Sequence, residues 1–164
     1  MSLGYSENPK IPALILSAYA SNDREWVVSA LAAMGHSADA QWSPKILASL
    51  GHSHPQIRSE AARAAGELEI NKAVSRLLEL LEDDDDTATR QAVIWSLAQI
   101  GGEGVRKGLE TALENSSDEE EQDYIEEALE LLSFTEESTL FPILDLDGSD
   151  DLDEYSDDEI EEGI

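Results

Sequence analysis

Residues 54–68 read HPQIRSEAARAAGEL, and residues 86–100, 32 positions later, read DTATRQAVIWSLAQI. The two stretches align Arg58 with Arg90 and Leu68 with Ile100. Weaker copies lie 34 positions before the first stretch and 32 positions after the second. A repeat period in this range is typical of stacked helical hairpins, in which each unit buries its apolar face against its neighbours.

A second apolar segment follows each of the first three copies. Its apolar residues recur at i, i+4 and i+8, the spacing of one helix face. These segments are residues 44–50, 71–81 and 104–113, and residues 9–20 form an earlier unpaired one. The sequence therefore predicts an all-α solenoid of about four helical hairpins, with no strand signals.

Local signals predict where the helices begin. Asn22 and Ser117 each precede a glutamate by three positions, which is the spacing of a capping box. Ser43 before Pro44 predicts another N-cap, with proline at the first helical position. We expect Trp42 and Trp26 to be core or staple residues.

The pattern Asp86-x-x-x-Arg90-x-x-Val93-Ile94-x-x-Leu97-x-x-Ile100-Gly101 resembles the short HEAT repeats of the phycobilisome lyase family and its relatives. The resemblance covers residues 9–133 and implies a right-handed α–α superhelix whose second helices line the concave side. It also implies that acid and arginine pair between neighbouring units. That ladder should be incomplete, because Ala20 and His54 occupy acidic positions and Gln122 replaces arginine.

The repeat pattern divides the chain into residues 1–133, the solenoid, and residues 134–164, an acidic C-terminal tail, and the charge changes before that boundary. Of 37 acidic and 10 basic residues, 21 acidic and no basic ones fall after residue 115. The negative electrostatic field of these carboxylates repels nucleic acid and anionic membranes. We therefore expect neither as a partner, and expect either a basic protein at the tail or an acidic segment elsewhere.

Five of the ten cations are predicted to lie off the buried face of the second helices and to form one basic stripe. They are Lys45, Lys72, Arg76, Arg106 and Lys107. The hypothesis is that this stripe binds an acidic, apolar-punctuated peptide, from a partner or from the chain's own tail. Ordinary pairing of these cations with Glu79, Glu82 and Glu110 is the alternative. The tail residues that would dock are Leu140, Phe141, Ile143, Leu144 and Tyr155.

Trp95 is a further candidate for partner binding. At 100° per residue it falls roughly opposite Val93, Ile94 and Leu97, which predicts a place on the convex surface. Arg63 of the preceding repeat could then stack on the indole. The alternative is that the ring lies flat on a neighbouring helix.

Catalytic and metal-binding classes find little support. The chain has no cysteine, and its three histidines, His36, His52 and His54, fall on turns at two opposite edges of a helical layer. We expect no catalytic residues, no metal site and no cofactor. No apolar run is long enough to span a membrane, so a cytoplasmic protein is expected.

The sequence therefore favours a non-catalytic protein–protein interaction scaffold. The alternative, implied only by the resemblance, is a bilin-lyase-like subunit or maturation factor for a chromophore-bearing protein. Because the helix at 9–20 lacks its partner, the N-terminal end is poorly protected, and a homodimer through that end is also expected.

Overall fold

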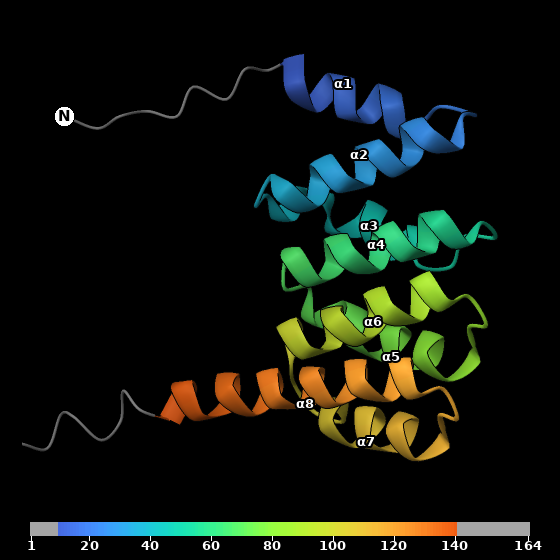
Figure 1. The fold of residues 1–164 in the computed structure, drawn as a ribbon. Helices are drawn as coiled ribbons and strands as arrows, with labels where there is room; N and C mark the ends of the chain where they lie inside the picture. The colour runs from blue at the N-terminus through green and yellow to red at the C-terminus, as the bar shows by residue number, and fades with distance from the viewer. Residues whose placement is uncertain (1–9, 141–164) are drawn as a thin grey trace, which may run out of the picture.

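A computed structural model describes residues 10–140 of the chain, and in that range every regular element is helical. Eight α-helices and two short 3₁₀ turns stack into a column, with α1 at one end and α7 and α8 at the other (Figure 1). The elements are α1 (Lys10–Tyr19), α2 (Arg24–His36), η1 (Ala40–Trp42), α3 (Ser43–Ser49), α4 (Pro55–Glu67), η2 (Asn71–Ala73), α5 (Val74–Asp83), α6 (Thr87–Ile100), α7 (Val105–Asn115) and α8 (Glu119–Leu140). The all-α repeat fold is as predicted.

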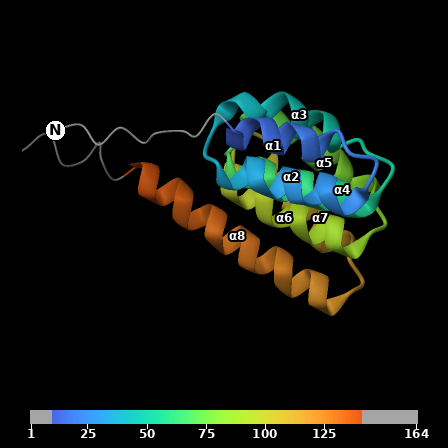
Figure 2. The ribbon, with the colours of Figure 1, turned by 90° about the horizontal axis from the view of Figure 1, so that it is seen from above.

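The helices form two layers. Helices α2, α4, α6 and α8 follow one another down one layer, and α3, α5 and α7 form the other (Figures 1 and 2). Each repeat is one hairpin with one helix in each layer. The core forms where successive hairpins pack against each other. The fully buried side chains include Leu31 of α2, Ile94 of α6 and Ile125 of α8, which the repeat alignment places at core positions.

Small residues let the helices of the first layer approach closely. In α4, four alanines are buried, and Gly66 lies against α6. A Cβ at Gly66 would lie 2.8 Å from Ser96 Oγ and 2.9 Å from Ser96 Cα. A hydrogen bond also joins the two helices here, because the Ser96 hydroxyl of α6 donates to the Ala62 carbonyl of α4 at 2.5 Å. Helix α6 also packs against α5 and α8, which is why its apolar residues are not confined to one stripe.

The helix starts differ from the sequence prediction by one residue. Asp23, not Asn22, caps α2, and its Oδ1 accepts from the Glu25 N–H at 2.9 Å. Before α8, Asp118 Oδ1 accepts from the Glu120 N–H at 3.1 Å, so Ser117 is not the cap either. Aspartate is an equally good N-cap, and each predicted box contains one directly after the predicted cap.

Helix α8 runs through the predicted end of the solenoid. It continues to Leu140, seven residues past the boundary at 133, and its last turns project beyond the other helices (Figure 1). Helix α8 therefore crosses the predicted boundary between solenoid and tail, and the division into those two parts stays a prediction. The remainder of the tail, including Phe141, Ile143, Leu144 and Tyr155, lies outside the described residues.

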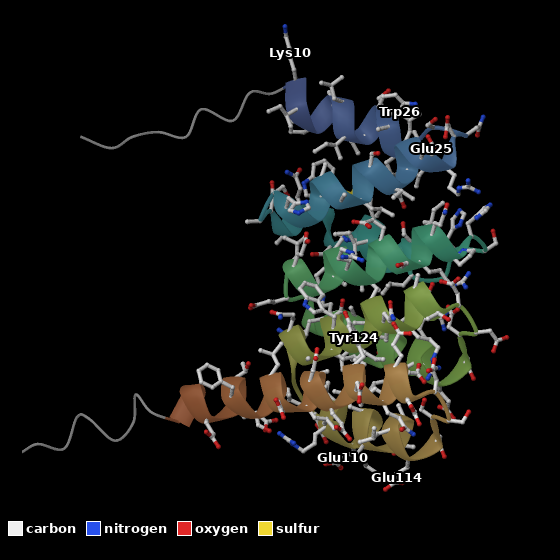
Figure 3. All side chains as sticks on the ribbon, viewed as in Figure 1. Lys10, Glu25, Trp26, Glu110, Glu114 and Tyr124 are labelled. Carbon is white, nitrogen blue, oxygen red and sulfur yellow. The ribbon has the colours of Figure 1, made fainter. Side chains whose placement is uncertain are left out.

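Two tryptophans have different surroundings. Trp42 is 4% exposed and belongs to the core, as predicted. Trp26 is 60% exposed, so the prediction that it is a core or staple residue is wrong. It lies on the first turn of α2, beside α1 at the end of the described column (Figure 3). None of the helices described is both long and apolar enough to cross a bilayer.

Candidate protein-interaction surfaces

Arginine–carboxylate pairs join neighbouring repeats. Arg90 Nε of α6 lies 2.5 Å from Glu121 Oε1 of α8, and Ser116 Oγ donates to the other Glu121 oxygen at 2.6 Å. Burial raises the pKa of Glu121, but the hydrogen bonds from Arg90 and Ser116 and the Arg90 charge outweigh it, so this pKa lies below its ordinary value. These groups are committed to the fold and are not free to bind a partner.

The ladder differs in detail from the one that the resemblance implies. Arg58 of α4 pairs with Asp84, in the turn before α6, at 2.7 Å. Asp86, the acid of the repeat pattern, instead caps α6 and accepts from the Thr89 N–H at 2.8 Å. The inter-repeat pairing is present, with a different acid as its partner.

The predicted basic stripe is interrupted by pairing within the chain. Arg76 Nη1 lies 2.6 Å from Glu79 Oε2, as in the alternative weighed for the stripe. Lys45 is half-buried, with Nζ 5.5 Å from the centre of the Tyr19 ring. Lys72 and Lys107 are exposed.

Arg106, the fifth cation of the stripe, is held by α8. Its Nη2 lies 2.7 Å from Glu136 Oε2 and donates to Ser133 Oγ at 3.1 Å. Three of the five cations are therefore engaged within the chain, and the stripe is not one continuous free basic surface.

A groove of about 630 Å³ opens between α5 and α7 in the second layer. Leu78 and Leu81 supply its apolar surface. Two cations also line it: Arg90 is paired with Glu121, whereas Lys107 has no ion pair among the contacts described. Glu82, Asp118 and Glu121 also line it. With more carboxylates than cations, this groove is a poor match for the acidic peptide predicted for this face.

A smaller groove, of about 180 Å³, lies between α6 and α8 in the first layer. Its lining is mostly apolar and aromatic, and consists of Trp95, Ala98, Tyr124, Glu127, Ala128 and Leu131. Figure 3 shows Tyr124 on the side of α8 that faces α6. We call this surface the α6–α8 groove.

Trp95 is half-buried in this groove rather than fully on an outer surface. Its Cζ3 would meet a Cβ on Gly66 at 2.8 Å, so that the indole lies against α4, as in the alternative weighed for it. Arg63 Nε lies 3.8 Å from Glu60, and within residues 10–137 the cation seated over an aromatic ring is Lys45 over Tyr19. The predicted stacking of Arg63 on Trp95 is therefore not formed.

Sequence reasoning missed Tyr124 and Leu131. Both are apolar residues of α8 outside the positions assigned to the core, and Leu131 is 37% exposed. Phe134, one turn further along α8, is 71% exposed. The signal that could have found them is the presence of large apolar side chains in so acidic a helix.

Large apolar side chains are also exposed at the N-terminal end of the column. Ile11 and Leu14, three positions apart on α1, are 55% and 68% exposed, and Trp26 of α2 is 60% exposed at the same end of the column (Figure 3). Leu16 is 42% exposed but lies on nearly the opposite side of α1 from Leu14, because two helix positions are about 200° apart. Helix α1 has no buried residue. We call Ile11, Leu14 and Trp26 the N-terminal apolar face.

The histidines are divided as predicted. His36 ends α2 and lies 3.5 Å from Glu67, whereas His52 and His54 have their ring centres 6.5 Å apart in the turn before α4. In the part of the chain that the structure describes, no three histidine, aspartate or glutamate side chains gather as a metal site would require.

Comparison with known proteins agrees with the architecture. A family model described as HEAT repeats matches residues 43–130, more than half of the 164 residues. A stretch of 61 residues is 36% identical to epoxyqueuosine reductase of Bacillus cereus, covering 37% of this chain but only 16% of the reductase. The similarity to the reductase is thus confined to a small part of that enzyme. HEAT repeats generally act as protein-interaction scaffolds, and this chain belongs to the HEAT-repeat family.

Proposed function

We propose that this chain is a non-catalytic interaction scaffold that binds a segment of a partner protein in the α6–α8 groove. The observation that carries the proposal is the lining of that groove, in which Trp95, Tyr124 and Leu131 are brought together from two repeats. Tryptophan and tyrosine are the side chains most enriched among residues that dominate binding energy at protein interfaces. A solenoid surface supplies such sites without any catalytic group.

The size of the groove favours a side-chain anchor over a small molecule. Small-molecule sites usually have volumes of about 300–1,000 Å³, and this groove has about 180 Å³. That volume accommodates one or two side chains of a segment lying along the surface. Phe134, exposed further along α8, extends the apolar path beyond the groove.

Charge indicates the chemistry of the partner segment. Helix α8 carries nine carboxylates and no cation, and Glu127 lines the groove itself. A segment with lysine or arginine around an apolar anchor would complement this rim, whereas an acidic segment would be repelled. The proposed partner is therefore a basic protein segment, in line with the basic partner expected from the composition of the tail.

Binding of an acidic segment to the second layer remains a separate proposal, with Lys72 and Lys107 as its exposed cations. The hypothesis that the chain's own tail masks this second-layer surface is part of the same proposal. Because α8 extends to Leu140, its test is deletion of residues 141–164, which leaves the helix whole. A synthetic peptide with the sequence of residues 141–155 should then bind the shortened chain more tightly than the full chain. Equal affinity would contradict masking. The bilin-lyase alternative stays a prediction of the resemblance alone.

Selection from a phage-displayed library of random peptides tests the α6–α8 groove on the full chain. We expect the enriched peptides to combine lysine or arginine with a large apolar residue. Leu131→Ala should weaken their binding about tenfold, which corresponds to about 1.4 kcal/mol. Leu16→Ala is the matched control, because Leu16 is similarly exposed at the other end of the column. No enrichment, or peptides that bind Leu131→Ala equally well, would exclude the groove as the site. Acidic peptides that depend on Leu131 would keep the site and overturn its basic partner.

A further inference from the structure

The N-terminal apolar face is unusual for the end of a helical repeat array. Terminal repeats normally present a polar outer face to water, because no neighbour covers them. Here Leu14, Ile11 and Trp26 are each more than half exposed. Single exposed apolar residues are ordinary, but large ones gathered on one end indicate a surface that another molecule covers.

The charge at this end differs from that of the rest of the molecule. The whole chain has a formal net charge of −27. Apart from His36, helices α1 and α2 carry Lys10, Arg24 and Glu25 as their charged residues, and with the N-cap Asp23 of α2 there are two charges of each sign. A surface with balanced charge can meet a copy of itself without strong repulsion, although the molecule as a whole is highly acidic.

The opposite end cannot receive the N-terminal apolar face. It is formed by α7 and α8, and Glu110 and Glu114 of α7 lie there, both exposed (Figure 3). Helix α8 adds its nine carboxylates. Head-to-tail stacking would bury apolar side chains against this acidic surface and desolvate charges without partners. Growth into a filament is therefore disfavoured, whereas contact between two N-terminal ends is not.

We propose that two copies of this chain associate head to head through the N-terminal apolar face, as a closed two-fold dimer. In such an interface the same patch is used by both copies, so that it is self-complementary and leaves no free copy of itself to recruit a third chain. Leu14 and Trp26 of each copy are covered by the other copy. The acidic ends then lie at the two extremes of the dimer, as far from each other as the column allows.

The dimer would change what the scaffold can do. Each copy keeps its α6–α8 groove away from the interface, at the far end of the column (Figure 1). Two linked binding sites increase the apparent affinity for a partner that carries two segments. The proposal itself does not depend on the groove, because it rests on the exposed side chains and charge of α1 and α2.

Sedimentation equilibrium of the full chain over a range of concentrations tests the dimer. We expect the mass to rise from 17.9 kDa toward twice that value and no further. Leu14→Glu should raise the dissociation constant at least tenfold. Phe134→Glu is the matched control, since Phe134 is 71% exposed and Leu14 is 68% exposed, and it should leave the dimer intact.

A second variant guards against damage to α1. Trp26→Ser, on α2, should also favour the monomer, and circular dichroism of both variants should retain the wild-type helix content. A wild-type mass that stays at one chain at all concentrations overturns the proposal. So does a dimer that survives both Leu14→Glu and Trp26→Ser, or one that Phe134→Glu abolishes. Masses above two chains would overturn the closed arrangement.

Discussion

Arg58 and Asp84 form a two-point contact between the first helix of a hairpin and the turn that leads to the next hairpin, although 26 positions separate them in sequence. Arg58 Nε donates to Asp84 Oδ2 at 2.7 Å, and Nη2 donates to Oδ1 at 2.9 Å. The remaining terminal nitrogen donates to the carbonyls of His52 and Ser53 at 3.0 and 3.1 Å. The Asp84 side chain is only 4% exposed. One guanidinium therefore fixes the turns on both sides of its own hairpin.

Removal of Arg58 should destabilise the solenoid strongly. Arg58→Ala leaves the buried Asp84 carboxylate without its main partner, and breaking such a pair costs about 3–5 kcal/mol. We expect a loss near the lower value, about 3 kcal/mol, because Arg58 is 18% exposed. The measurement is the free energy of unfolding in urea. Arg63→Ala is the control, since Arg63 is 55% exposed and 3.8 Å from Glu60, and it should change stability by less than about 0.5 kcal/mol. Equal losses in the two variants would contradict the assignment.

The same contact predicts a pH dependence of stability. Burial raises the pKa of Asp84, but the hydrogen bonds from Arg58 and the Asp86 N–H, with the charges of Arg58 and Arg90, outweigh it, so the folded pKa lies below the ordinary 3.8. A depressed folded pKa gives stability that is present above the unfolded value and is lost as pH falls through the folded value.

Comparison with Asp84→Asn isolates this contribution. The difference in unfolding free energy between wild type and Asp84→Asn should be largest at neutral pH and shrink below about pH 3.8. All other carboxylates are common to both proteins, so repulsion among them largely cancels in the difference. A difference that stays constant from neutral to acidic pH would show that the Asp84 charge is not what Arg58 stabilises.

Much of the fold follows from the sequence because the repeat period and the buried positions repeat together. In the repeat alignment Leu31 corresponds to Leu97 and Ile125 to Val93, so that with Ile94 they occupy three core positions of one template. Burial of such positions is what the hairpin stack requires. Helix starts were less predictable, because Asn22 and Asp23 are both good caps and only backbone geometry selects between them. The length of α8 was also missed, since its apolar period fades before Leu140.

The candidate surfaces were predicted less well, for physical reasons. Periodicity tells which side of one helix is buried, but pairing of Arg106 with Glu136 depends on how far α8 extends. Trp95 lies opposite the apolar stripe of α6, and only the small residue at Gly66 makes room for its ring against α4. Trp26 lies at the end of the described column and is 60% exposed, although its own helix continues into the core. Each case depends on contacts between helices that one helix pattern does not contain.

Gly66 should be intolerant of a methyl group. An alanine Cβ there would lie 2.8 Å from Trp95 Cζ3 and 2.9 Å from Ser96 Cα, and the latter is backbone that cannot rotate away. Gly66→Ala should therefore force α4 and α6 apart and cost about 1–3 kcal/mol, with an altered near-ultraviolet circular dichroism spectrum from Trp95. Gly51→Ala is the control, because no atom lies closer than 3.8 Å to its added Cβ. If Gly66→Ala were as stable as wild type, the close α4–α6 contact would be refuted.

Arg106 should stabilise the end of α8 locally rather than the whole fold. Its Nη2 contacts both Ser133 and Glu136, but Arg106 and Glu136 are 40% and 53% exposed, so the pair is largely solvated. The contact raises the pKa of Arg106 through the hydrogen bond to Glu136, and the arginine stays charged at every pH used for folding studies.

Arg106→Gln should leave the urea midpoint unchanged within error. Amide hydrogen exchange of residues 134–140 should become faster, because the projecting turns of α8 lose their side-chain link to α7. Lys107→Gln, the adjacent exposed cation, serves as the control and should leave that exchange unchanged. Equal exchange in wild type and Arg106→Gln would mean that α8 holds its last turns without help from α7.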